Sequence, residues 1–166
     1  MVGSGMGAEH GILIRSGEAI QTLKDVSVIV FDKTGTITKG KPEVTDVVTA
    51  SGADRQRVLS AAASAEWGSE HPLGRAIVER AAAEELDLLE PQGFQAIRGR
   101  GVIATVDGHR VLVGSRRLVQ EHGLDPTPLE DALRELEEDA KTAMLVAVDE
   151  QIIGLVAVAD AMKEDS

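Results

Sequence analysis

Residues 26–38, VSVIVFDKTGTIT, join an apolar run to a short polar motif. The run Val26–Phe31 predicts a buried parallel strand, because such strands are covered on both faces and are almost continuously apolar. Asp32 would then follow the carboxyl end of the strand, where open α/β sheets bind ligands. A carboxylate there can attack a phosphoryl group and form an aspartyl-phosphate. Lys33 would add positive charge beside the phosphate, and Thr34–Thr36 would offer hydroxyls and backbone N–H groups.

A lone Asp-Lys pair would indicate only an ordinary strand end, so the interpretation depends on the whole string Asp32–Thr38. That string resembles the phosphorylation motif of P-type ATPases, which are similar to the wider haloacid dehalogenase-like superfamily. Phosphatases of that superfamily carry a second Asp two residues after the nucleophile, as general acid and base. Here the position is Thr34, which does not ionise near neutral pH. The resemblance therefore implies a long-lived aspartyl-phosphate that can be coupled to a conformational change.

Composition narrows the classes of function. The chain has 166 residues, enough for one domain with a core or one domain with part of a second. It has no Cys, which excludes disulfides and thiolate metal sites. The net charge of −11 predicts no binding to nucleic acid or anionic membrane. No apolar run reaches the length of a membrane span and no signal peptide is visible, so we expect a soluble, cytoplasmic chain.

The remaining sequence alternates helical and strand patterns. Asp107-Gly108 is a strong signal for a hairpin turn between two short strands. Residues 39–42 suggest a linker, in which Pro42 ends regular pairing. These patterns predict an α+β module, an antiparallel sheet flanked by helices, inserted between the Asp32 strand and the tail Asp160–Lys163. The predicted strands are 11–14, 44–48, 93–98, 102–106, 109–113, 143–148 and 152–159, and the predicted helices are 16–24, 54–66, 73–89, 115–122 and 128–139.

Two glycine patterns suggest other nucleotide folds, and neither fits. Gly35–Lys41 nearly matches a P-loop, but Pro42 stands where a Ser or Thr should hold Mg²⁺. Gly99–Ala104 fits G-x-G-x-x-[GA], but a strand rather than a helix is predicted to follow. Gly99 and Gly101 would let the backbone approach a ligand closely, or would simply form a tight turn or β-bulge.

A second constellation of candidate residues lies in the inserted module. Pro72 fixes the backbone after His71, so the imidazole is presented from the first turn of a helix and could stack on adenine. Glu66 lies five residues earlier and could accept a hydrogen bond from an exocyclic amine. Each residue also has a simpler interpretation, His71 as a surface residue at a helix start and Glu66 as a solvated acid.

Together with Asp32–Thr38, these residues point to one family. Ser69-Glu-His-Pro-Leu73, followed by Gly99-x-Gly101-Val102, resembles the nucleotide-binding domain of heavy-metal-transporting P-type ATPases. Ser115 stands where that family usually has Asn, and its hydroxyl would take the place of the amide. The resemblance implies that ATP contacts Glu66, His71, Gly99, Gly101, Gly114 and Ser115. No basic residue is among them, so we expect ATP and ADP to bind similarly.

The same resemblance divides the chain into three parts. Residues 1–40 would follow a membrane helix and begin the phosphorylation domain, 41–159 would form the nucleotide-binding domain, and 160–166 would return to an incomplete haloacid dehalogenase-like domain. The catalytic residues would be Asp32, Lys33 and Thr34, with the Asp32 carboxylate and the Thr34 carbonyl as an incomplete Mg²⁺ site. The family's downstream Thr-Gly-Asp and Gly-Asp-Gly-x-x-Asn-Asp segments do not occur in the sequence.

Three functions remain open. The chain could be the ATP-binding cytoplasmic portion of a heavy-metal pump, with the copper/silver branch favoured by similarity at Glu70 and Met1–Ile20. It could be a free-standing phosphatase or ATPase, or a regulatory module. For the first, the predicted cofactors are ATP and Mg²⁺, and the predicted partners are ATP or ADP and the rest of the pump. Self-association through the strand 26–31 is a further predicted contact.

Overall fold

The computed structural model describes residues 5, 8–12, 16–50 and 52–163 and divides the chain into two units, 1–32 and 33–166. In the first unit, helix α2 (Gly17–Leu23) confirms the predicted helix. Residues 24–32, all of them described, form neither helix nor strand, so the predicted strand 26–31 is wrong. A strand needs partners for its backbone groups, and none of the six strands of the described sheet is paired with this segment. In the predicted strand 11–14, Gly11 and Ile12 are not in a strand, and residues 13 and 14 lie outside the described residues.

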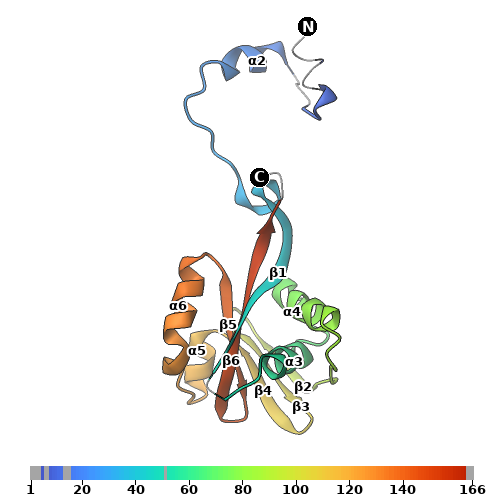
Figure 1. Cartoon of the computed structure of the whole chain (residues 1–166), viewed down its shortest axis with the longest axis vertical. Coiled ribbons are helices and arrows are strands. Elements are labelled where there is room, and N and C mark those ends of the chain that lie inside the picture. The colour runs from blue at the N-terminus through green and yellow to red at the C-terminus, as the bar shows by residue number, and fades with distance from the viewer. Residues whose placement is uncertain (1–4, 6–7, 13–15, 51, 164–166) are drawn as a thin grey trace. The chain divides into compact units, whose positions relative to one another are not determined.

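In the second unit, the described residues form one antiparallel sheet of six strands, in the order β1-β6-β5-β4-β3-β2 (Figure 1). Every neighbouring pair is antiparallel, which confirms the predicted α+β fold class with its helix-flanked antiparallel sheet. The strands are β1 (Thr38–Thr49), β2 (Gln92–Ile97), β3 (Gly101–Val106), β4 (His109–Gly114), β5 (Thr142–Val148) and β6 (Gln151–Met162).

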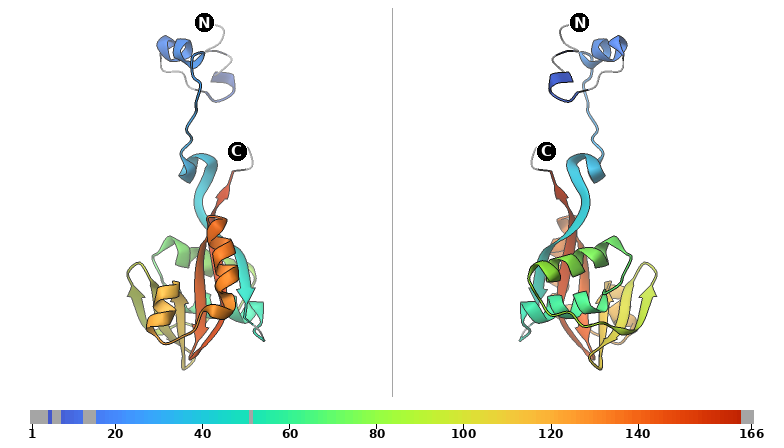
Figure 2. Two further views of the ribbon diagram at one scale, coloured as in Figure 1. Left: turned by 90° about the vertical axis from the view of Figure 1, so that its left-hand side faces the viewer. Right: turned by 90° about the vertical axis from the view of Figure 1, so that its right-hand side faces the viewer.

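Helices cover both faces of this sheet. The two views of Figure 2 show α5 and α6 before one face, and α3 and α4 before the other. The helices are α3 (Arg55–Ala65), α4 (Pro72–Ala83), α5 (Arg116–Glu121) and α6 (Glu130–Glu138), with a 3₁₀ turn η2 (Thr127–Leu129) before α6. Each face has its own apolar cluster, because successive strand side chains point to opposite faces. Val146 therefore packs with α3 and α4, while Leu145 packs with α5 and α6.

The local turns follow from the residue types at them. Asp107 and Gly108 both have positive φ, 50° and 78°, as the predicted two-residue hairpin turn requires. Helix α4 ends six residues before the predicted Leu89, because Glu85 adopts a φ of 54°. The Leu86 amide then donates to the Ala81 carbonyl at 3.0 Å, which closes the helix in a Schellman arrangement.

Strand β1 corrects the prediction for residues 39–42. These residues continue the strand rather than forming a linker, and Pro42 pairs with Asp160 beside a register shift. The sheet tolerates this proline because β1 is an edge strand, where a missing N–H can face solvent. Strands β1 and β6, each of 12 residues, therefore continue together beyond the other strands of the sheet (Figure 1).

Candidate functional site

A cavity of about 550 Å³ lies in the second unit, where the end of α3, the start of α4, the β2–β3 turn, the start of α5 and strand β5 meet. The elements come from distant parts of the sequence, and the sheet register brings them together. Five of the six residues predicted to contact ATP line this cavity. They are Glu66, His71, Gly99, Gly101 and Ser115.

Glu66 is the buried polar residue of the cavity. It is the C-cap of α3, only 4% of its surface is exposed, and burial raises the pKa of its carboxyl. The Ser69 hydroxyl and the charge of His71 oppose this rise in pKa. Its Oε2 has no hydrogen-bond partner among the described residues. The interpretation of Glu66 as a solvated acid is therefore wrong, and a buried carboxylate oxygen beside the cavity remains without a hydrogen-bond partner.

Gly74 makes room for the Glu66 carboxylate. A Cβ atom at position 74 would overlap Glu66 Oε2 and would lie 2.7 Å from the Ser69 hydroxyl oxygen. Gly74 is buried in the first turn of α4. The absence of a side chain at this position therefore leaves the space in which the carboxylate lies.

His71 is the N-cap of α4, with Pro72 at the first helical position, as the sequence predicted. Its Nδ1 accepts a hydrogen bond from the Leu73 amide at 3.3 Å. This bond requires an unprotonated Nδ1, so a neutral ring carries its proton on Nε2. The cap fixes the ring at the cavity while the residue stays exposed, which leaves the imidazole accessible for stacking.

Gly99 and Gly101 are glycines for different structural reasons. Gly99 has a φ of 68° within the turn that Arg100 N–H closes by donating to the Ile97 carbonyl at 2.9 Å. Gly101 pairs with Gly114 across β3 and β4, and a Cβ on Gly101 would overlap the Val113 carbonyl oxygen. A tight turn and a close backbone approach thus account for Gly99 and Gly101 as structural residues, and both also line the cavity.

Gly114 and Ser115 mark the passage from β4 into α5. Gly114 has no space for a side chain, because a Cβ there would overlap the Arg100 carbonyl oxygen. Ser115 is the N-cap of α5, and its Oγ accepts a hydrogen bond from the Leu118 amide at 3.4 Å. The Ser115 hydroxyl still carries a proton that it can donate toward the cavity.

Two basic residues at the cavity were missed by the sequence analysis. Arg98 and Arg100 flank Gly99 in the β2–β3 turn, and both line the cavity. Arg100 forms an ion pair with Glu121 of α5, whereas Arg98 has no ion pair with any described residue. The sequence did offer a signal for a basic site, because two arginines lie within three residues of a chain that is otherwise strongly acidic. Their presence removes the basis for expecting ATP and ADP to bind similarly.

The residues predicted to be catalytic are divided between the two units. Asp32 is exposed and ends the first unit, whereas Lys33 and Thr34 begin the π-helix η1 (Lys33–Ile37) of the second. No group of three His, Cys, Asp or Glu side chains in the described part of the chain could hold a metal ion. The Asp32 carboxylate and Thr34 carbonyl would give Mg²⁺ two of the six oxygen ligands it prefers. The magnesium site therefore stays a prediction.

The segment that follows Asp32 is attached to the end of β6. The Thr38 hydroxyl donates to the Asp160 carboxylate, which also accepts the Lys41 amide at 3.1 Å. Lys163 Nζ donates to the Gly35 carbonyl oxygen at 2.9 Å, and its amide to the Ile37 carbonyl oxygen at 3.0 Å. The Asp160-x-x-Lys163 pattern thus holds η1 and the start of β1.

Comparisons with known proteins show the family to which the chain belongs. A family model described as a haloacid dehalogenase-like hydrolase matches residues 26–166. The "Probable copper-exporting P-type ATPase" of Archaeoglobus fulgidus is 46% identical over 166 residues, which cover 99% of this chain and 20% of that protein. The chain thus spans about a fifth of the length of the curated relatives it matches.

Two solved structures are similar as well. A zinc-transporting PIB-type ATPase in its E2.Pi state has a TM-score of 0.82 and 34% identity, over 96% of this chain and 26% of that one. The N-domain of HMA6, a copper-transporting P-type ATPase, has a TM-score of 0.60 and 27% identity, over 71% of this chain and 98% of that one. The second match shows that an N-domain of this kind fits almost entirely within the present chain.

Proposed function

Because this chain belongs to the haloacid dehalogenase-like hydrolases and matches a segment of copper-exporting P-type ATPases along its whole length, we propose that it is the ATP-binding portion of a heavy-metal-transporting P-type ATPase. In this proposal, residues 41–159 form the nucleotide-binding domain, inserted between the first and later parts of a phosphorylation domain. Residues 1–40 and 160–166 belong to those flanking parts. The cavity beside Glu66 is the ATP site.

The unpaired carboxylate oxygen of Glu66 is the observation that carries this proposal. A buried acceptor without a partner costs about 1–3 kcal/mol, and a ligand that supplies a donor recovers that energy. The exocyclic amine of adenine is such a donor. The exposed ring of His71 offers a face for the base, and the Gly99–Gly101 edge lets the ligand approach the backbone. A carboxylate, an imidazole and a bare backbone edge at one cavity therefore suit adenosine.

The chemical step belongs to Asp32. In the full-length pump its carboxylate oxygen would bond to the γ-phosphorus of ATP, while the bond to the β–γ bridging oxygen breaks and ADP leaves. Lys33 would offset negative charge at the phosphoryl group. The Asp32 carboxylate and the Thr34 carbonyl would hold Mg²⁺, which neutralises charge during the transfer. Without a carboxylate at position 34, the resulting phospho-enzyme would hydrolyse slowly.

Copper is the cation we propose for the whole pump. The similar curated proteins named as copper exporters are 42–46% identical to this chain over 98–100% of its length. Among the described residues, no helix has the length and apolar character to cross a bilayer. The cation would be bound in membrane-spanning parts of the pump, and we propose that this portion lies on the cytoplasmic side.

Nucleotide titration of the whole chain, followed through its backbone amide resonances, tests the ATP site. We expect a dissociation constant in the millimolar to sub-millimolar range, about −4 to −5 kcal/mol. Resonances of His71, Gly99 and Gly101 should shift. Shifts confined to Gly35–Lys41 would contradict the proposed site and favour a P-loop.

The variant Glu66→Gln tests directly whether the Glu66 carboxylate binds ATP. An amide oxygen is a weaker acceptor than a carboxylate, so ATP affinity should fall by about fivefold. Because burial raises the pKa of Glu66, ionisation is less favourable in the folded than in the unfolded chain, and stability falls as pH rises through that raised pKa. The variant should therefore melt no lower than the unchanged chain at neutral pH. The matched control is Glu135→Gln, an exposed change on α6. Equal ATP affinity in Glu66→Gln and the control would overturn the assignment of Glu66.

A further inference from the structure

The cavity has opposite charges at its depth and at its mouth. Glu66 lies buried within it, and Arg98 lies exposed where the β2–β3 turn borders it. A simple anion would meet the Glu66 carboxylate, and a simple cation would meet Arg98. The arrangement suits a ligand with hydrogen-bond donors at one end and negative charge at the other, which is the chemistry of a nucleotide rather than a nucleoside.

Arg98 is held in position by its backbone and free at its side chain. It occupies the second position of the turn Ile97–Arg100, which the hydrogen bond from Arg100 N–H to the Ile97 carbonyl closes. The strand pair Ile97–Gly101 on either side fixes where the turn lies. The guanidinium has no ion pair among the described residues, so no protein carboxylate competes with a ligand for it.

The neighbouring arginine is not free in the same way. Arg100 is paired with Glu121, which also accepts from Arg117 at 3.0 Å. The backbone carbonyl of Arg100 accepts the Ser115 amide at 2.7 Å, so this residue also joins the turn to α5. The contacts of Arg100 are therefore largely structural, and Arg98 alone at the cavity combines exposure with an unpaired positive charge.

We propose that Arg98 binds the phosphate chain of the nucleotide and makes the site prefer nucleoside polyphosphates over nucleosides and monophosphates. This inference rests on the proposed ATP site and goes beyond it, because none of the six residues assigned to that site carries a permanent positive charge. A planar guanidinium matches two phosphate oxygens at once. Because the chain carries a net charge of −11, an unpaired cation at the mouth is needed locally to offset repulsion of the triphosphate.

Titration with adenosine, AMP, ADP and ATP tests the proposal in the unchanged chain, in Arg98→Gln and in Arg98→Lys. In the unchanged chain affinity should rise with the number of phosphates. Arg98→Gln should weaken ATP binding by about fivefold and leave adenosine binding within about 1.5-fold, because only the phosphate contact is removed. Arg98→Lys keeps the charge but loses the two-pronged guanidinium contact, so it should recover only part of the ATP affinity. The control Arg134→Gln removes one charge from exposed α6 and should change neither.

Salt provides a second measurement. Raising sodium chloride from about 50 to about 300 mM shortens the range of the attraction, so the preference for ATP over adenosine should shrink in the unchanged chain and stay small in Arg98→Gln.

The possible outcomes distinguish a failure of this inference from a failure of the proposed ATP site. Normal adenosine binding with no gain from AMP to ATP would overturn the inference and leave the nucleotide site standing. Equal losses of adenosine and ATP in Arg98→Gln would also overturn it, because Arg98 would then only shape the turn. A chain that binds none of the four ligands would overturn the proposed function and the inference together.

Discussion

The cavity and the segment around Asp32 differ in what surrounds them. The cavity lies within one unit, and its walls are ends of helices and strands whose other residues fill the two apolar clusters. The segment Val26–Phe31 belongs to the other unit and exposes its apolar side chains, from 46% of Val26 to 89% of Val30. Asp32 follows directly on that exposed run.

This difference has a physical cause. In the second unit, each strand of the sheet pairs with another strand of the same unit. A strand of the kind that is buried on both faces is stabilised only when neighbouring strands pair with it and other elements cover its two faces. The second unit therefore contains the elements that form the cavity, whereas the described residues offer no strand partner for the run before Asp32.

The largest expected difference between the two regions is catalytic. The chain should bind ATP and yet form no phospho-enzyme at Asp32, because the transfer needs an aligned nucleophile and a bound metal ion. Loss of that geometry costs several kcal/mol of barrier, about a thousandfold or more in rate. Incubation with radiolabelled ATP and Mg²⁺, followed by acid quench, measures it. Label that is present in the unchanged chain and absent in Asp32→Asn would contradict the prediction and show that Asp32 can be phosphorylated in this chain.

The second largest effect concerns the backbone edge of the cavity. A Cβ at Gly101 would lie 2.5 Å from Gly114 Cα and would overlap the Val113 carbonyl oxygen, at a φ of 141°. Gly101→Ala should therefore cost about 3 kcal/mol or more, because β3 and β4 must separate. Urea unfolding measures the loss.

Gly99→Ala is the matched control for Gly101→Ala. Nothing lies within 4 Å of its Cβ position, and only the positive φ of 68° penalises alanine. Its cost should be about 1–2 kcal/mol. Equal costs at the two positions would show that β3 and β4 can move apart, and that the cavity edge is not part of a rigid sheet.

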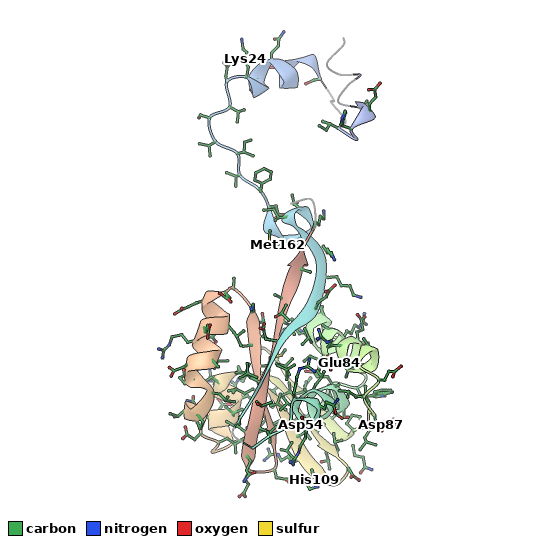
Figure 3. The ribbon with its side chains drawn as sticks, viewed as in Figure 1. Lys24, Asp54, Glu84, Asp87, His109 and Met162 are labelled. Carbon is green, nitrogen blue, oxygen red and sulfur yellow. The ribbon has the colours of Figure 1, made fainter. Side chains whose placement is uncertain are left out.

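An ion-pair network tests how firmly the cavity's helices are held. Glu84, labelled in Figure 3, is the C-cap of α4. Its Oε2 lies 2.6 Å from Arg55 Nη1 and its Oε1 lies 2.5 Å from Arg80 Nε, which joins α3 to the end of α4. Hydrogen bonds from Arg55 and then Arg80 lower the pKa of Glu84 to about 2. Glu84→Gln should destabilise the domain by about 1–2 kcal/mol at neutral pH, because the half-exposed partners limit the gain.

The pH dependence of this effect has a fixed sign. The folded pKa lies below the usual value of 4.5, so the folded chain binds fewer protons, and the stabilisation is complete above pH 4.5. It is lost as pH falls from 4.5 toward about 2. Thermal unfolding of Glu84→Gln and the unchanged chain should therefore converge in acid. Glu79→Gln, on the exposed side of α4, is the control and should show a smaller difference at all pH values.

The sequence predicted most of the cavity because its residues belong to strong local patterns. Pro72 predicted that His71 lies at the start of a helix, and Asp107-Gly108 predicted the hairpin that places β3 beside β4. Arg98 was missed because an arginine in a turn is usually a solvated charge, and only the register reveals the cavity beside it. The strand through Pro42 was missed because a proline is acceptable there only when β1 is an edge strand, which depends on the sheet order.

The smallest expected effect belongs to His71. Its side chain is exposed, and its Nδ1 accepts the Leu73 amide as the cap of α4. His71→Ala should weaken ATP binding by about three- to tenfold, since aromatic stacking contributes about 0.5–1.5 kcal/mol. Loss of the cap should cost about 0.5–1 kcal/mol of stability and open no internal cavity.

His71→Asn separates stacking from capping, because asparagine caps a helix well but has no ring. This variant should keep the melting temperature of the unchanged chain and lose ATP affinity as His71→Ala does. Thermal unfolding beside nucleotide titration measures both quantities. Full ATP affinity in His71→Asn would mean that His71 only orders the start of α4. The free energy of ATP binding would then come from Glu66 within the cavity and Arg98 at its mouth.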